Sequence, residues 1–349
     1  MQLEYLLKNI APWLSGDGPE ADIILSSRIR LARNLKHFKF LRKTTEADRR
    51  EILGLITEGI SQNKSLPAAV VVELEEIGEL DRLFLRERHL ISRELSPDNQ
   101  GAVVIGDKEI VSLMINEEDH LRIQIMRAGL SLSRCWDEIL LIDSDLEKFL
   151  EYAFSPVFGY LTACPSNVGT GMRASVMIHL PALVIHKQID KIIQAVGKLG
   201  LAVRGINGEG SPATGNIFQI SNQSTLGKSE KEIVSDLEKI IRRIIIHERK
   251  GRAALLEGDS LRMEDRIYRA LGLLRNTRLI SSEETIDLLS SLRMGIDLGL
   301  IKTISRGVVN QLFFQTQPAH LQKLSGSTLD AEKRDALRAN LIREKLKIS

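Results

Sequence analysis

The chain has few cysteines and almost no net charge, and each shortage excludes a class of protein. Its 349 residues include two cysteines, too few for a disulfide framework, so we expect a cytoplasmic protein. The 48 lysines and arginines nearly balance the 46 aspartates and glutamates, so no overall field attracts nucleic acid or membranes. The sequence also lacks an apolar run of about 18 residues and a signal peptide, so we expect no membrane partner.

Alternating apolar residues and turn residues predict a sheet over the first two-thirds of the chain. Candidate strands are 22–33, 69–74, 102–105, 111–115, 173–180, 201–205 and 217–221, and helical patterns cover 46–61, 132–149 and 181–199. Because these helices do not alternate strictly with the strands, we predict an α+β fold, a mostly antiparallel sheet flanked by helices.

The pattern changes to helix after residue 228. Ser229 and Glu232 form a capping-box signature before a helical apolar stripe, and Ser281 with Glu284 repeats that signature. We therefore predict a mixed domain over residues 1–250 and an all-helical domain over 251–349.

The stretch Gly169-Thr-Gly171-Met-Arg-Ala174 formally matches the dinucleotide-binding fingerprint. That fingerprint requires a helix to open at its third position, so that the helix N-terminus can hold a pyrophosphate. Here the following residues alternate in polarity and stop at Pro181, which is typical of a strand. We therefore expect no dinucleotide site.

Five arginines stand beside small or polar residues at predicted strand edges: Arg28, Arg30, Arg122, Arg173 and Arg204. Arg28 and Arg30 are two apart, so both would project from one face of a strand. A guanidinium is always charged and its planar fork matches phosphate oxygens. If the five converge, they could hold a nucleoside triphosphate in a chain that lacks a P-loop. The alternative is that each is an ordinary surface or ion-paired arginine.

Carboxylates and a cysteine accompany these arginines. The run 116–120 reads NEEDH directly after an apolar strand, and Glu209 lies between two glycines. Paired carboxylates can hold a planar cation and accept its proton, although a solvated acidic turn is the alternative. Cys164, before Pro165, is either a reactive thiolate or a packed thiol.

Four segments taken in order resemble the phosphagen (guanidino) kinase family. They are SSRIRLAR (26–33), NEEDHLRIQ (116–124), CPSNVGTGMRASV (164–176), and VRGINGEG (203–210) with GNIFQISNQ (215–223). The resemblance is greatest to one branch, the bacterial protein-arginine kinases. Small-substrate members carry a helical domain before the first arginine motif, whereas SSRIR begins here at residue 26. They also lack a helical domain after the last motif, where this chain continues to residue 349.

The resemblance implies ATP with Mg²⁺ as phosphoryl donor and an arginine side chain as acceptor. Residues implied to bind the nucleotide are Ser26, Ser27, Arg28, Ile29, Arg30, His89, Arg122, Arg173, Ala174, Ser175, Val176, Met177, Arg204, Gly205, Ile206, Asn207, Gly208 and Glu209. Magnesium would travel on the nucleotide with no dedicated protein site, and Glu117 would lie near it.

The same resemblance implies the catalytic roles. Glu118 would orient the guanidinium and take its proton, Glu209 would be a second anchor, and Cys164 would polarise the guanidinium as a thiolate. Met177 stands where small-substrate members place a histidine against adenine, and its sulfur can pack on a purine.

In the helical domain, the segment 334–339 reads RDALRA and is similar to the phosphoarginine-binding motif of this branch. Arg334 and Arg338 are four residues apart and share a helix face with Asp335 close by, followed by Ala339. An ordinary charged helix face is the alternative.

The expected partners are proteins bearing arginine, a small zinc-binding activator protein, the Clp protease system in a stress response, and a second copy of the chain. Two other functions remain open at this point. One is a kinase for free arginine or another small guanidine, and the other is a non-catalytic adaptor that reads phosphoarginine.

Overall fold

A computed structural model describes residues 3–66, 68–205 and 214–347, and its centre is an eight-stranded sheet. The strands, in spatial order, are β2 (Val70–Glu73), β3 (Ala102–Ile105), β4 (Val111–Ile115), β5 (Leu121–Ala128), β1 (Ile24–Arg33), β8 (Met172–His179), β10 (Ile217–Asn222) and β9 (Leu201–Gly205). Every pairing between the described strands is antiparallel, which confirms the predicted fold class. A separate small hairpin joins β6 (Phe154–Ser155) and β7 (Gly159–Tyr160).

Several elements differ from the sequence prediction, which also lacked the short helices at 4–8 and 79–87 and the small hairpin. Strand β5 was not predicted, although Leu121, Ile123 and Ile125 alternate with polar residues and are fully buried. The predicted helix 181–199 is two helices, α5 (Pro181–Ile185) and α6 (Ile189–Lys198). Lys187 between them has a φ of 53°, a left-handed conformation that a continuous helix cannot contain.

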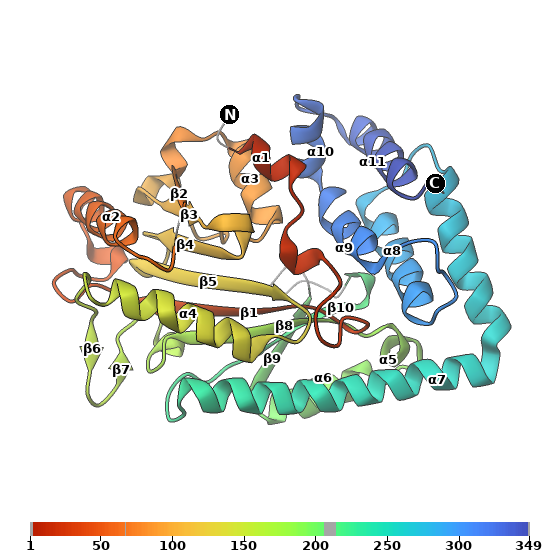
Figure 1. Ribbon diagram of the computed structural model, residues 1–349, viewed down its shortest axis with the longest axis horizontal. Coiled ribbons are helices and arrows are strands. Elements are labelled where there is room, and N and C mark those ends of the chain that lie inside the picture. Colours follow the sequence, from red (N-terminus) through yellow and green to blue (C-terminus); the bar gives the residue numbers. More distant parts are fainter. Residues whose placement is uncertain (1–2, 67, 206–213, 348–349) are drawn as a thin grey trace.

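One face of the sheet is covered by α4 (Leu132–Leu146) and the first part of α7 (Glu230–Asn276), as Figure 1 shows. Ile29 and Ile123 on that face share a buried apolar cluster with Ile139 of α4 and Leu237 of α7. Because strand side chains alternate, the residues between these apolar positions face the other side of the sheet. The helices α1 (Glu4–Lys8), α2 (Glu46–Ser61) and α3 (Glu79–Glu87) complete the N-terminal part.

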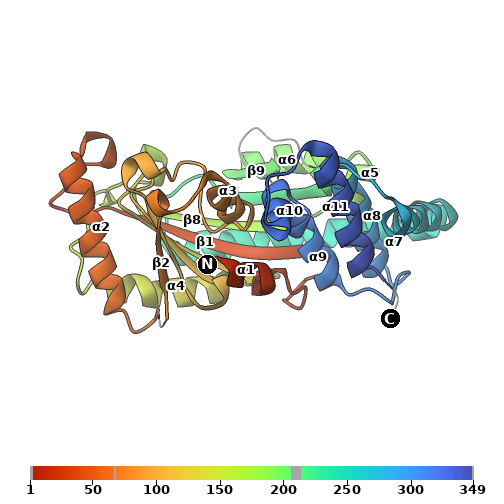
Figure 2. The same cartoon turned by 90° about the horizontal axis from the view of Figure 1, so that it is seen from above.

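The C-terminal part is helical, as predicted. After α7 it contains α8 (Ser282–Asp297), α9 (Arg306–Gln315), α10 (Pro318–Ser325) and α11 (Ala331–Lys345). Helix α7 passes through the predicted domain boundary at residue 250 and bends at Asp259, whose φ of −157° is not helical. Figures 1 and 2 show α7 running beneath the sheet and then continuing among the C-terminal helices.

Ion pairs join the C-terminal helices to α7, and through α7 to α5. Asp297 accepts a hydrogen bond from Arg306 Nε at 2.7 Å and lies 3.6 Å from Arg252 Nη1. Arg252 also donates to Glu248, and Glu248 accepts the backbone N–H groups of the first turn of α5. Within residues 3–66, 68–205 and 214–347, no helix is both long enough and apolar enough to cross a bilayer.

The capping box at the start of α7 is formed as the sequence predicted. Ser229 Oγ accepts from Glu232 N at 3.4 Å, and Ser229 N donates to Glu232 Oε2 at 2.8 Å. We predict that Ser229→Ala lowers the free energy of unfolding by about 1 kcal/mol. Urea denaturation would measure it, with Ser144→Ala on the exposed face of α4 as the control. An equal loss in both variants would contradict a specific role for the cap.

Candidate active site

Three adjacent strands place four arginines on the same face of the sheet. Arg28 and Arg30 are two residues apart in β1, so both side chains leave the same face. Arg30 is paired with Arg173 of β8, and Ala32, the next residue on that face, is paired with Arg122 of β5. Directly paired residues of adjacent strands share a face, so the four guanidinium groups start from one patch, here called the arginine cluster.

Arg204 of β9 belongs to the same face. It is paired with Gln219 of β10, which is in turn paired with Met177 of β8. Arg28 donates to Gln219 Oε1 at 3.1 Å and to Ser175 Oγ at 3.4 Å. Gln219 was not singled out in the sequence, but a glutamine inside the apolar strand 217–222 is a signal that could have identified it.

The arginine cluster has an excess of positive charge. Burial, and then the charges of Arg122 and Arg173, lower the pKa of Arg28 to about 10. Burial and the neighbouring arginines lower the pKa of Arg30 as well, with Glu117 opposing them. The Nε atom of Arg30 is buried and has no hydrogen-bond partner among the described residues. A bound anion would offset this excess of positive charge.

The acidic run 116–120 forms the turn between β4 and β5, at one end of the arginine cluster. Glu117 is 3% exposed and accepts hydrogen bonds from Arg122 Nη1 and Ser92 Oγ. Its second oxygen accepts from the backbone N–H of Glu118 at 2.8 Å. Because all these contacts are internal, Glu117 serves to hold Arg122 in place, and Ser92 is a contributor that the sequence did not suggest.

Glu118 is more open than Glu117. Its side chain is 32% exposed, and Oε2 lies 3.5 Å from Arg122 Nη2. Burial raises the pKa of Glu118, and the charges of Asp119, Glu117 and Glu94 raise it further against the effect of Arg122. A carboxylate that is accessible and has a raised pKa is suited to accept a proton.

Asp119 links the acidic turn to the segment that carries the cysteine. Its Oδ1 accepts hydrogen bonds from Asn34 Nδ2 and from the backbone N–H of Ala163, both at 2.6 Å. Ala163 immediately precedes Cys164, whose Sγ is partly exposed and lies 3.0 Å from Ser166 Oγ. The segment that carries Cys164 is thus bonded to Asp119, the residue that follows Glu118 in the same turn.

Four predicted nucleotide contacts have side chains on the opposite face. Ile29 is paired with Ala174, and Ser27 is paired with Val176, one residue away from the arginine positions in each strand. The three apolar side chains are fully buried, and Ser27 Oγ donates to Gly129 O at 2.8 Å. Ser26, paired with Met177, does face the arginine side.

Residues 172–179 form strand β8, so the helix that a dinucleotide fingerprint requires is replaced by a strand. Gly205 ends β9. The predicted residues Ile206, Asn207, Gly208 and Glu209 lie outside the described residues.

His89 follows α3 and reaches the arginine cluster from a different part of the chain. Burial, and then the charges of Arg28 and Arg30, lower the pKa of His89 to about 3, so the ring is neutral at physiological pH. Met177 is 5% exposed and lies among the residues that contact the C-terminal helices.

The RDALRA segment lies in α11, far along the chain from the arginine cluster. Arg338 is 1% exposed and donates to Thr316 O at 2.9 Å and Ile280 O at 2.8 Å, and it also pairs with Asp335. Arg334 is partly exposed and donates to Leu329 O at 2.7 Å. Ala339 is buried. In this conformation Arg338 fastens α11 to its neighbours, while Arg334 and Asp335 reach the surface.

Two family models match the chain. Residues 52–251 match the ATP:guanido phosphotransferase, C-terminal catalytic domain. Residues 260–349 match the protein-arginine kinase McsB C-terminal domain.

Curated relatives match along the whole length. The protein-arginine kinase of Bacillus cereus (strain AH187) is 48% identical over 351 residues, covering 100% of this chain and 99% of the relative. The protein-arginine kinase of Bacillus anthracis has the same identity and coverage.

Solved structures share the fold. A crystal structure of lombricine kinase is 27% identical with a TM-score of 0.59, covering 72% of this chain and 73% of that one. The duplicated taurocyamine kinase from Schistosoma mansoni, solved with bound transition state analog components, is 26% identical with a TM-score of 0.61. This match covers 67% of the present chain and 34% of the duplicated one.

We predict opposite stability changes for two identical substitutions in β1. Arg30→Met removes a partly buried charge that is repelled by its neighbours, so the free energy of unfolding should rise by about 1–2 kcal/mol while affinity for ATP falls. Arg33→Met is the matched control on the other face, where Arg33 pairs with buried Asp143 at 2.7 Å and lies 3.5 Å from the Tyr160 ring centroid.

The control should lose about 3–5 kcal/mol because Asp143 would remain buried without its partner. Chemical denaturation and ATP titration of both variants measure these changes. A destabilised Arg30→Met protein with unchanged ATP affinity would show that the arginine cluster does not serve a ligand.

Proposed function

The chain belongs to the ATP:guanido phosphotransferase family and is an enzyme of its protein-arginine kinase branch, and from this premise we propose how its residues carry out the transfer. The acceptor is the guanidinium of an arginine side chain in a protein, and the donor is ATP. The observation that carries the proposal is the convergence of Arg28, Arg30, Arg122 and Arg173 on one face, beside Glu118.

The arginine cluster binds the triphosphate. Fixed guanidinium groups offset the charge that spreads over the phosphoryl oxygens during in-line transfer. The orphaned Nε of Arg30, without a partner in the described part of the chain, supports an anion at this position. Arg204 extends the cluster, and the neutral His89 and Met177 border the nucleotide.

Magnesium enters with the nucleotide as part of the substrate. Among the described residues, no group of three or more histidines, cysteines, aspartates and glutamates is arranged to hold a metal ion. Glu117 forms an ion pair with Arg122, so it would lie near the phosphates that Arg122 binds.

Glu118 is the catalytic base. One guanidinium nitrogen attacks the γ-phosphorus, the bond from that phosphorus to the bridging oxygen breaks, and ADP leaves. The nitrogen gives up its proton to the Glu118 carboxylate. A guanidinium has a pKa above about 12, so deprotonation must coincide with attack, and alignment by carboxylates makes this feasible. Glu209 is proposed as the second anchor and Cys164 as the thiolate that polarises the guanidinium.

We also propose a division of labour along the chain. Residues 1–250 carry the catalysis, and residues 251–349 form a helical regulatory domain whose RDALRA segment binds phosphoarginine. Arg334 and Asp335 of this segment lie at the surface, and Arg338 and Ala339 lie buried behind them. The enzyme is cytoplasmic, forms a homodimer and is activated by a zinc-binding protein. It acts in a stress response, in which its phosphorylated proteins are degraded by Clp-type proteases.

The transfer is tested with labelled ATP and two acceptors, a protein and free arginine. We expect acid-labile phosphate on the protein, whereas label on free arginine alone would favour a small-guanidine kinase. Glu118→Gln should lower kcat by about 100-fold or more while ATP affinity stays close to that of the unmodified enzyme. Glu58→Gln, which changes an exposed glutamate of α2, is the matched control.

The same enzyme should show a pH signature. Because the pKa of Glu118 is raised, the acidic fall in kcat/KM should begin at a higher pH than an ordinary glutamate would give. The base acts only when deprotonated, so activity decreases as pH falls through this pKa. Full activity in Glu118→Gln would remove Glu118 from the mechanism.

Regulation is tested by adding free phosphoarginine. We expect Arg334→Ala to lose the change in activity that phosphoarginine causes, because a partly exposed guanidinium that could meet the phosphate is gone. Lys333→Ala, which removes an exposed charge one residue away, should keep the response. Equal responses in the two variants would argue against a phosphoarginine site on α11.

A further inference from the structure

Three consecutive residues at the end of α3 face two different parts of the molecule. Glu87 and Arg88 contact α10 of the C-terminal helices, whereas His89 reaches the arginine cluster. A displacement of α10 would therefore reach His89 through only one or two residues of the chain.

Glu87 supplies the cap that α10 does not supply for itself. Its carboxylate accepts the backbone N–H groups of Ala319 at 2.8 Å and His320 at 2.9 Å. His320 Nδ1 also lies 2.8 Å from Glu87 Oε2. Within the described ranges, Gln317, the N-cap residue of α10, makes no side-chain capping bond. A carboxylate at a helix N-terminus is favourable because it meets both the free N–H groups and the helix dipole.

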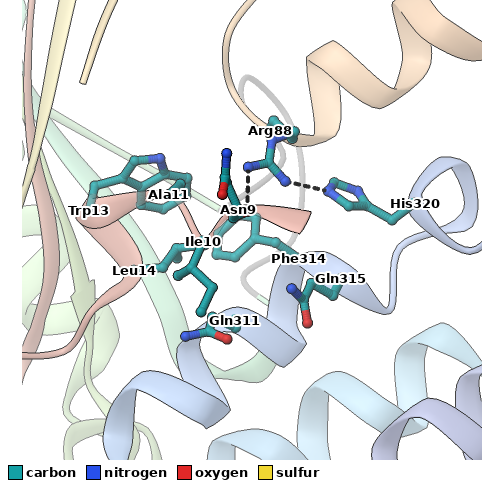
Figure 3. Close-up of a pocket in the computed structure, with 10 residues that line it drawn as sticks. All are labelled: Asn9, Ile10, Ala11, Trp13, Leu14, Arg88, Gln311, Phe314, Gln315 and His320. Carbon is teal, nitrogen blue, oxygen red and sulfur yellow. Dashed lines mark hydrogen bonds between the residues drawn. The ribbon is translucent and has the colours of Figure 1, made fainter. Parts of the chain in front are cut away.

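We call the contacts of Glu87 and Arg88 with α10 the junction. Arg88 extends it to the N-terminal segment. It pairs with buried Glu109, donates to Asn9 O at 3.3 Å and lies 3.4 Å from His320 Nε2, as Figure 3 shows for the last two contacts. Figure 3 also shows Trp13 and Phe314 at the same small cavity, which these residues line. The junction thus joins α3, α10 and the segment before β1.

His89 is held by aromatic residues from both sides of this junction. Its ring centroid lies 5.7 Å from Trp13 and 5.4 Å from Phe314 of α9, both in edge-on geometry. The backbone of His89 has a φ of 58°, and its carbonyl accepts from Gln124 Nε2 at 2.7 Å. Gln124 is paired with Arg30, so the support of His89 lies within the arginine cluster. An uncommon left-handed histidine persists only where its surroundings fix it.

We propose that Glu87 is a positioning residue for the nucleotide site: by capping α10 it fixes the junction that holds the His89 ring against the arginine cluster. The proposal rests on the proposed function, in which His89 borders the nucleotide. Its consequence is that the C-terminal helices control ATP affinity through α10. A ligand that shifts these helices would change the KM for ATP before it changes the chemical step.

A double-mutant cycle between Glu87→Gln and His89→Ala tests this inference. Glu87→Gln keeps the size and one acceptor oxygen but removes the charge, so the fold should survive. We expect the KM for ATP to rise about fivefold, the low end of the usual coupling between sites, with kcat nearly unchanged. In the His89→Ala background the same substitution should have no further effect on KM.

Two further variants make the result specific. Phe314→Leu removes the aromatic contact with His89 and should raise the KM for ATP in the same direction. Glu79→Gln is the matched control, because Glu79 is an exposed glutamate in the first turn of the same helix. It should leave the KM for ATP unchanged.

The failures can be told apart. An unchanged KM for ATP in His89→Ala would overturn the assignment of His89 to the nucleotide site, and this proposal with it. A raised KM in His89→Ala with no change in Glu87→Gln would overturn the positioning role alone. Equal increases caused by Glu87→Gln in both backgrounds would also overturn it, because Glu87 would then act independently of His89.

Discussion

The mutual repulsion of guanidinium groups on one face of the sheet is the constraint on which the rest of the structure depends. Arg28, Arg30, Arg122 and Arg173 start from adjacent positions in three strands, and their charges lower one another's proton affinity. Such an arrangement costs free energy in the absence of an anion, because partly buried like charges repel one another more strongly than charges in water. The opposite face offsets this cost with continuous apolar packing against α4 and α7.

The contrast between Arg30 and Arg33 shows how the same residue type serves two purposes in one strand. Arg33 lies on the packed face, where Asp143 and the ring of Tyr160 satisfy its charge completely. Arg30 lies on the other face with an Nε that nothing in the described ranges satisfies. Because side chains alternate along β1, Arg33 lies on the packed face and has a structural role, whereas Arg30 lies on the opposite face and is available to a ligand.

The sequence predicted the antiparallel sheet, the helical C-terminal part and the cap at Ser229, because each depends on local periodicity or on residues a few positions apart. It also indicated that Arg28 and Arg30 share a face. It could not predict the contacts of Arg28 with Gln219 or of His89 with Phe314, since the partners are brought together only by the fold. Strand β5 was not predicted, because the charged run before it and the two arginines within it give the segment the polarity of a loop. The roles of Glu118, Cys164 and the RDALRA segment remain predictions.

Helix α7 belongs to two apolar cores at once. Leu237 and Ile241 pack under the sheet, whereas Ile267 and Leu274 pack among the C-terminal helices. A shared helix ties the loss of one core to the loss of the other, so the two parts should melt as a single cooperative unit. The C-terminal part could therefore not be exchanged as an independent module during evolution unless α7, which packs in both cores, were replaced as well.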